Sequence, residues 1–221
     1  MFKGTSASAG IGIGKAVIVE EAELVITRNE VADAEAEIQR FKGALEKTIA
    51  ATQKMADDLA SRVGEKEAEI MQGHMMLLSD PMLTGEIENS VKNDKVNSEF
   101  AIENVCNMYA DMFASMGDEL MQQRATDMRD IKVRMQRTLM GLESVDVSLL
   151  PKGSILVAKD LTPSMTAGIN PENVSGIVTE LGGKTSHSAI LARALEIPAV
   201  VAVNGLMDAV KDGDSVVLDG S

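Results

Sequence analysis

The sequence has little of the side chains that form covalent cross-links or metal centres. Cys106 is the one cysteine among 221 residues, so no disulfide can form within the chain and a structural zinc site is disfavoured. His74 and His187 are the two histidines, too few for a multi-histidine metal centre. The N-terminus, Met1 to Gly4, lacks the apolar run of a signal peptide, and no stretch of about 18 apolar residues could span a membrane. These absences predict a soluble cytoplasmic protein.

Positive charge is also scarce. The chain carries 21 Lys and Arg against 34 Asp and Glu, which gives a formal net charge of −13. Proteins that bind nucleic acids need a basic face to neutralise phosphates, so the charge balance disfavours that class. An acidic protein is more readily steered toward a basic partner.

Proline is rare in the first two thirds of the chain, and its distribution divides the sequence. One of the five prolines, Pro81, precedes Pro151, whereas 12 of the 15 methionines lie between Met55 and Met140. A segment with so little proline can form long helices, so residues 27–144 are predicted to be helical. After them, short apolar runs alternate with glycine and proline, as in α/β folds.

Apolar residues recur at helical spacing in this middle segment. From Val31 to Leu59 they follow at steps of three and four, which predicts a helix beginning near Asn29 as its N-cap. Asp80-Pro81 is expected to end the second helix. The four expected helices, which would pack as an antiparallel bundle, span 29–62, 65–79, 98–116 and 118–142. Their methionines fit core filling better than an adaptable protein-binding groove.

Both ends of the chain have the composition of strands. Strands are expected at 11–19, 154–158, 174–178, 199–203 and 215–218, with short helices at 162–168, 186–195 and 206–210. A lone N-terminal strand needs a partner, so we expect it to join the C-terminal sheet. The predicted fold class is therefore α/β, formed by 1–26 and 145–221, with an inserted all-α subdomain at 27–144.

The stretch from Gly182 to Arg193 follows an expected strand and begins an expected helix. Its two glycines permit a tight turn, and Thr185 or Ser186 can cap the helix. His187 then lies in the first turn, where backbone N–H groups and the helix dipole favour an anion. A neutral imidazole there can accept a phosphoryl group. The alternatives are a histidine without a chemical role and a loop that holds a nucleotide phosphate, although Walker and Rossmann glycine patterns are both missing.

The same stretch resembles the phosphohistidine signature of phosphoenolpyruvate-utilising enzymes, which include enzyme I of the bacterial sugar phosphotransferase system, pyruvate phosphate dikinase and phosphoenolpyruvate synthase. Three more segments resemble enzyme I in particular: Leu161–Ala167, Gly73–Pro81 and Arg124–Ile131. The resemblance covers essentially the whole chain. It implies an α/β phosphohistidine (swivelling) domain with an inserted four-helix, all-α subdomain that binds the phosphocarrier protein HPr.

The activity that the resemblance implies is phosphoryl transfer from phosphoenolpyruvate, through Nε2 of His187, to the histidine of HPr, the first step of sugar uptake by group translocation. Thr166 matches a threonine that hydrogen-bonds this histidine, and Arg193 matches the arginine of the signature. Arg193 lies about 600° round the helix from His187, so ordering the C-terminal end of the helix is its alternative role. The implied phosphate loop consists of Gly182, Gly183, Lys184, Thr185, Ser186 and Ser188. Lys184 assists the phosphate electrostatically or is a solvated lysine.

The resemblance also implies a face of the helical segment that receives HPr. A mixed acidic and apolar face suits a basic, apolar partner surface. The candidates for this face are Glu65, Glu67, Glu69, His74, Met76, Leu77, Asp80, Leu83 and Arg124. A packing histidine is the alternative for His74, and a solvated helix surface is the alternative for each carboxylate. Cys106 is expected in the core.

Enzyme I continues into a (β/α)₈ domain that binds phosphoenolpyruvate and Mg²⁺ and forms the dimer, and 221 residues leave no room for a barrel of about 250 residues. We therefore expect an N-terminal fragment that is monomeric and holds no cofactor. It would exchange phosphoryl groups with HPr without charging itself from phosphoenolpyruvate. Two other functions stay open: a phosphohistidine module of a nitrogen-related or dihydroxyacetone kinase system, and a non-catalytic binding module with an inert His187.

Overall fold

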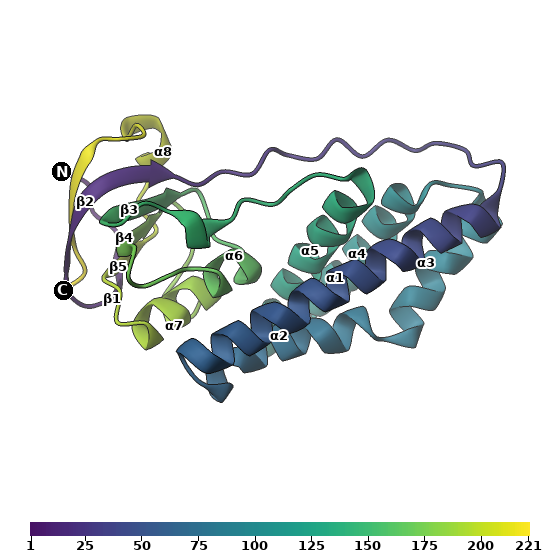
Figure 1. Ribbon diagram of the computed structural model, residues 1–221, viewed down its shortest axis with the longest axis horizontal. Coiled ribbons are helices and arrows are strands. Elements are labelled where there is room, and N and C mark those ends of the chain that lie inside the picture. Colours follow the sequence, from purple (N-terminus) through teal and green to yellow (C-terminus); the bar gives the residue numbers. More distant parts are fainter. The chain divides into compact units, whose positions relative to one another are not determined.

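Strands from both ends of the chain form one six-stranded sheet in the computed structural model, which describes residues 1–221 (Figure 1). The strands are β1 (Thr5–Ser8), β2 (Ile11–Ile18), β3 (Ser154–Ala158), β4 (Val174–Thr179), β5 (Ala199–Val201) and β6 (Ser215–Asp219). Their order across the sheet is β1-β5-β4-β3-β2-β6. The four central strands run parallel, and β1 and β6 pair antiparallel at the two edges. The prediction that the N-terminal strand joins the C-terminal sheet is confirmed, and β1 is an additional strand.

The middle strands of this sheet are buried on both faces, as expected of parallel strands with helices above and below. Leu156 of β3 faces a cluster that includes residues of α6 (Pro163–Ala167) and α7 (His187–Ala194). Ile155, the preceding residue, points to the opposite cluster, which includes α8 (Leu206–Ala209). The continuous apolar run in β3 therefore serves two cores, one on each side of the sheet.

The segment between β2 and β3 is helical, as predicted, and has one helix more than the four expected. Its helices are α1 (Ala34–Arg62), α2 (Glu65–Leu78), α3 (Pro81–Asp94), α4 (Ser98–Ser115) and α5 (Glu119–Met140), followed by a short 3₁₀ helix, η1 (Val147–Leu149). Their common core consists of buried side chains such as Phe41, Ile87, Ile102, Met128 and Ile131. No helix is both long and apolar enough to cross a lipid bilayer.

Two helix starts differ from the predicted ones. Pro81 does follow the end of α2, but it also occupies the first turn of α3, where proline is tolerated because its missing N–H would be unpaired anyway. Asp80 caps that helix by accepting a hydrogen bond from the amide of Met82 at 2.9 Å. The long helix α1 begins at Ala34 instead of near Asn29, and the Asp33 carboxylate accepts from the amide of Ala36 at 3.0 Å.

The chain divides into two compact units. The α/β unit comprises residues 1–21, 59–67 and 145–221, and the helical unit comprises residues 22–58 and 68–144. Within the α/β unit, the last residue of α1, Arg62, donates to the carbonyl oxygens of Ala167 at 2.7 Å and Ile169 at 2.6 Å. The end of α1 is thereby fastened to the segment that contains α6.

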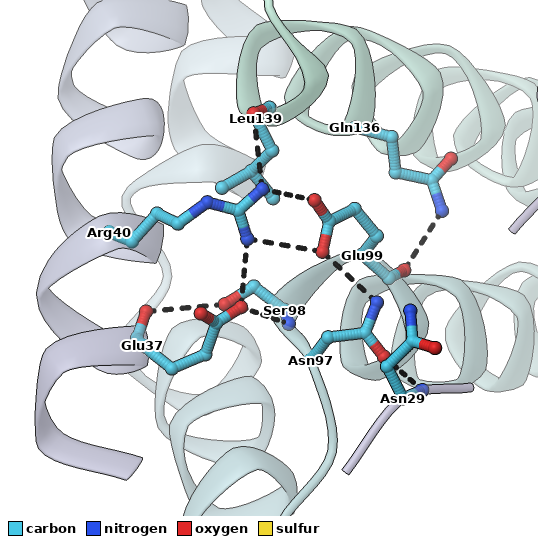
Figure 2. Close-up of polar contacts among 8 residues, drawn as sticks. All are labelled: Asn29, Glu37, Arg40, Asn97, Ser98, Glu99, Gln136 and Leu139. Carbon is cyan, nitrogen blue, oxygen red and sulfur yellow. Dashed lines mark hydrogen bonds and ion pairs between the residues drawn. The ribbon is translucent and has the colours of Figure 1, made fainter. Parts of the chain in front are cut away.

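A guanidinium clamp joins α1, α4 and α5 within the helical unit (Figure 2). Arg40 donates to Glu37 at 2.8 Å, to both carboxylate oxygens of Glu99, and to the carbonyl oxygen of Leu139 at 3.1 Å. Glu37 in turn accepts from the amide of Ser98 at 2.7 Å, at the start of α4. One arginine therefore fixes the positions of three helices.

The clamp changes the ionisation of its carboxylate. Burial acts to raise the pKa of Glu99, but the hydrogen bond and positive charge of Arg40 outweigh burial and hold that pKa below its usual value. The pKa of Arg40 is raised in turn, chiefly by its hydrogen bond to Glu99. Asn29 belongs to the same region, since its amide donates to the side chain of Asn97 at 2.8 Å instead of capping α1.

Candidate functional site

The loop between β4 and α7 lies at the carboxyl ends of the parallel strands, where α/β folds place their ligands. Gly182 has a φ of +100°, a conformation that side chains with a Cβ rarely adopt. The turn closes with a hydrogen bond from the amide of Ser186 to the carbonyl oxygen of Gly183 at 3.1 Å. Glycine is therefore needed at position 182 to lead the chain from the sheet into the helix.

Ser186 is the N-cap of α7, which decides between the two predicted caps. Its hydroxyl accepts from the amide of Ala189 at 3.3 Å and donates to the carbonyl oxygen of Gly183 at 2.8 Å. Because its proton is used there, Ser188 is the donor in the hydroxyl pair at 2.9 Å. His187 follows as the first residue of the helix and is 8% exposed. His187 thus begins the helix between two serines whose hydroxyls are hydrogen-bonded to each other.

Arg193 reaches back from the last turn of α7 to the loop that precedes the helix. Its Nη1 donates to the carbonyl oxygen of Lys184 at 3.1 Å and to that of Ala7 in β1 at 2.9 Å. Long side chains on a helix point toward its N-terminus, so an angular separation from His187 does not prevent this reach. The structure therefore gives the guanidinium of Arg193 a positioning contact with the loop, although the residue itself belongs to the last turn of α7.

Replacing Arg193 by methionine should loosen the loop without unfolding the sheet. Losing two hydrogen bonds from a charged donor should speed exchange of the Ser186 amide hydrogen by about tenfold. Amide exchange followed by NMR measures this change. Lys184→Met is the matched control, because Arg193 contacts the backbone of Lys184, and it should leave the exchange rate as it is. Equal rates in wild type and Arg193→Met would contradict the positioning role.

Thr166 is fully buried in α6, and its hydroxyl donates to the carbonyl oxygen of Thr162 at 2.9 Å. The hydroxyl proton is therefore committed within α6. What Thr166 can offer to His187 is an oxygen lone pair, so a hydrogen bond between them would need His187 as the donor. That contact stays a prediction.

The candidate residues for a partner face differ in burial. Met76 is 72% exposed, and the partly or fully exposed candidates are Glu65, Glu67, Glu69, Leu77, Asp80 and Arg124. Two candidates, His74 and Leu83, are 0% and 1% exposed. Leu83 packs into the helical core, and the Nε2 of His74 lies 3.1 Å from Oδ1 of Asp127. For His74 the structure agrees with the packing alternative, and Leu83 is packed in the same way, so neither side chain is exposed to a partner.

Several exposed methionines were not expected. Core filling holds for Met71, Met128 and Met135, which are at most 1% exposed. The exposed methionines that contradict it include Met76, Met82, Met108, Met112 and Met116. Three of them are four residues apart along α4 and its end, so they form one row on the helix. Their spacing was visible in the sequence, but spacing does not tell which flank of a helix is covered.

Cys106 is buried in the helical core, as predicted, and burial raises the pKa of its thiol to about 12. Such a thiol is a packing group at neutral pH. No group of three or more histidine, cysteine, aspartate or glutamate side chains has an arrangement that could hold a metal ion.

Two family models match the chain. One is described as PEP-utilising enzyme, N-terminal, and matches residues 3–124; the other is described as PEP-utilising enzyme, mobile domain, and matches residues 150–221. A phosphoenolpyruvate-protein phosphotransferase from Bacillus subtilis (strain 168) is 41% identical over 219 residues, and one from Listeria monocytogenes is 43% identical. Each alignment covers 99% of this chain and 38% of the relative, so the chain spans less than half the length of these proteins.

Solved structures give a matching result. The NMR solution structure of an Enzyme I protein aligns with all of this chain and 90% of that chain, with a TM-score of 0.85 and 40% identity. The N-terminal domain of Enzyme 1 – Nitrogen aligns with a TM-score of 0.66 at 24% identity, which shows a shared fold only.

Proposed function

Because this chain belongs to the family of PEP-utilising enzymes, we propose that its α/β unit exchanges a phosphoryl group, through Nε2 of His187, with a histidine of the phosphocarrier protein HPr. The observation that carries the proposal is the place of His187 as the first residue of α7, behind a serine-capped glycine turn. Backbone N–H groups and the dipole at a helix start stabilise the oxygens of a phosphoryl group.

The transfer is a displacement at phosphorus between two imidazoles. The lone pair of His187 Nε2 forms the new N–P bond while the N–P bond to the HPr histidine breaks, and the bonding electrons return to that ring. Each ring keeps the proton on its other nitrogen, so no external base is consumed. Catalysis then depends mainly on alignment of the rings and on donors to the phosphoryl oxygens.

The helical unit supports the proposal by the character of its surface. The exposed methionines of α2, α3 and α4 are flexible apolar side chains of the kind that proteins use at adaptable interfaces. The net charge of −13 favours a basic partner and speeds their encounter at low ionic strength. We propose that HPr docks on this acidic and apolar surface.

Intact mass after incubation with phosphorylated HPr tests the proposal. We expect the gain of one acid-labile phosphoryl group, and peptide mapping should locate it on His187. A parallel incubation with phosphoenolpyruvate alone distinguishes a phosphoryl group received from HPr from one received directly from phosphoenolpyruvate. Unphosphorylated HPr is the control. No gain from phosphorylated HPr would leave a different carrier or a plain binding module as the function.

A further inference from the structure

A guanidinium from α5 lies directly against the backbone of α2. A Cβ at position 73 would lie 2.5 Å from Nη1 of Arg124 and 3.5 Å from its Cζ, so the space beside Gly73 is filled by the arginine. Glycine destabilises the interior of a helix relative to alanine, and Gly73 is inside α2. Gly73 therefore destabilises α2, and its lack of a Cβ leaves room for Arg124 to approach the backbone of that helix.

Asp127 holds the same guanidinium from its own helix. Three residues after Arg124 on α5, its Oδ2 lies 3.5 Å from Arg124 Nη1. Its Oδ1 lies 3.1 Å from Nε2 of His74, the residue next to Gly73. The side chains of Asp127 and His74 are 6% and 0% exposed, so packing restricts both. The contacts form a chain from His74 through Asp127 to Arg124.

The tautomer of His74 follows from its surroundings. Its Nδ1 is buried and has no hydrogen-bond partner. A proton on Nδ1 would therefore be a buried donor without an acceptor, whereas a proton on Nε2 is donated to Asp127. The histidine thus orients the Asp127 carboxylate, which in turn orients Arg124.

The other side of Arg124 remains partly open, since its side chain is 34% exposed. A guanidinium has five N–H donors in a planar fork, and the donors that face outward are fixed in direction when the opposite side is held. Met76, three residues after Gly73 on α2 and 72% exposed, belongs to the partner surface proposed above. Arginine beside exposed apolar residues is typical of the residues that dominate the binding energy of interfaces.

We infer that Gly73, Asp127 and His74 are positioning residues that hold Arg124 as a fixed receptor for an oxyanion of the docking partner. The oxyanion is a phosphoryl or a carboxylate group, since the guanidinium fork recognises both in the same way. The inference rests on the proposed function, because it assigns Arg124 to the surface where HPr docks.

Gly73→Ala is the most direct test, with Gly43→Ala as its matched control. Both positions are inside helices of the helical unit, but a Cβ at Gly43 would meet nothing within 4 Å. Each variant should keep or raise the melting temperature. Gly73→Ala should also raise the KM for phosphorylated HPr about tenfold with little change in kcat, because the displaced guanidinium loses a charge-assisted hydrogen bond. Equal KM values in the two variants would overturn the inference.

His74 variants separate positioning from packing. His74→Gln places an amide nitrogen near the site of Nε2 and should retain a near wild-type KM, whereas His74→Leu removes the donor and should raise KM about as much as Gly73→Ala. Relaxation of the Arg124 Nε–Hε group by NMR gives a readout that needs no partner. It should show a restrained group in wild type and His74→Gln, and a mobile one in Gly73→Ala and His74→Leu. A group equally mobile in all four overturns the inference even if phosphoryl transfer fails altogether.

Arg124→Lys distinguishes the two sources of the oxyanion. If Arg124 binds the phosphoryl group, the variant should raise the Kd about tenfold for phosphorylated HPr alone. If Arg124 binds a carboxylate of HPr, the Kd should rise about tenfold for both the phosphorylated and the unphosphorylated form. Both results support an oxyanion receptor. An unchanged Kd for both forms excludes it.

Discussion

A chain with alanine in place of His187 should gain no phosphoryl group from phosphorylated HPr, and should still bind unphosphorylated HPr with the wild-type Kd. The substitution removes the nitrogen that forms the N–P bond, and neighbouring serine hydroxyls cannot form an acid-labile N–P bond in its place. The fold should persist, because alanine favours helices and the Ser186 cap stays intact. Intact mass for transfer and calorimetry for binding measure the two parts separately.

The neighbouring Ser188→Ala variant is the control for this experiment. It removes the hydroxyl that donates to Ser186 and leaves the imidazole in place, so transfer should slow by about tenfold at most. An acid-labile phosphoryl group on the His187→Ala variant would contradict the proposal. His74 would then be the remaining histidine, although its side chain is fully buried in the helical unit.

The arrangement of the sheet followed from local signals in the sequence. An isolated strand at the N-terminus cannot satisfy its backbone alone, and strands with similar apolar runs exist only after residue 145. The pairing of β2 with β3 and β6 agrees with this logic, which did not predict which strands would be the neighbours. The same local logic placed His187 at a helix start, because glycine, serine and the strand before them are local features.

The additional helix α3 shows where local signals are ambiguous. Asp80-Pro81 ends a helix because proline restricts the residue before it, and it begins one because aspartate caps and proline fits the first turn. The prediction used the first property alone. A helix with three buried residues, Leu83, Ile87 and Val91, was missed in this way.

Burial within the helical unit depends on tertiary packing and was the least predictable property. Met128 and Met112 both fit an apolar helical row, yet Met128 is 1% exposed and Met112 is 45% exposed. The resemblance assigned His74 to the partner face, with a packing histidine as the alternative. The structure agrees with the alternative, since His74 is buried and Asp127 of α5 is its partner. A single sequence does not state which helix packs on which flank.

The effect of Arg40→Met on the helical unit should be large and dependent on pH. The substitution leaves the carboxylates of Glu37 and Glu99, whose side chains are 14% and 12% exposed, close together without their common cation. Breaking a fully buried pair costs about 3–5 kcal/mol, and the 41% exposure of Arg40 reduces this, so we expect a loss of about 2–3 kcal/mol at pH 7. Amide exchange of α4 measures the free energy of opening of this unit in the whole chain.

The pH dependence and a matched control make this prediction specific. The pKa of Glu99 is lowered in the folded protein, so the stability it contributes is present above the unfolded pKa of about 4.3 and is lost as pH falls through the folded pKa. The free energies of unfolding of wild type and Arg40→Met should therefore converge as pH falls through the folded pKa of Glu99. Lys42→Met removes one exposed ion pair, to Glu88 at 3.2 Å, and should cost about 0.5 kcal/mol or less. The clamp does not stabilise the helical unit through its charges if Arg40→Met lowers the free energy of unfolding no more than Lys42→Met does. The same conclusion holds if the loss from Arg40→Met is equal at pH 7 and at a pH below the folded pKa of Glu99.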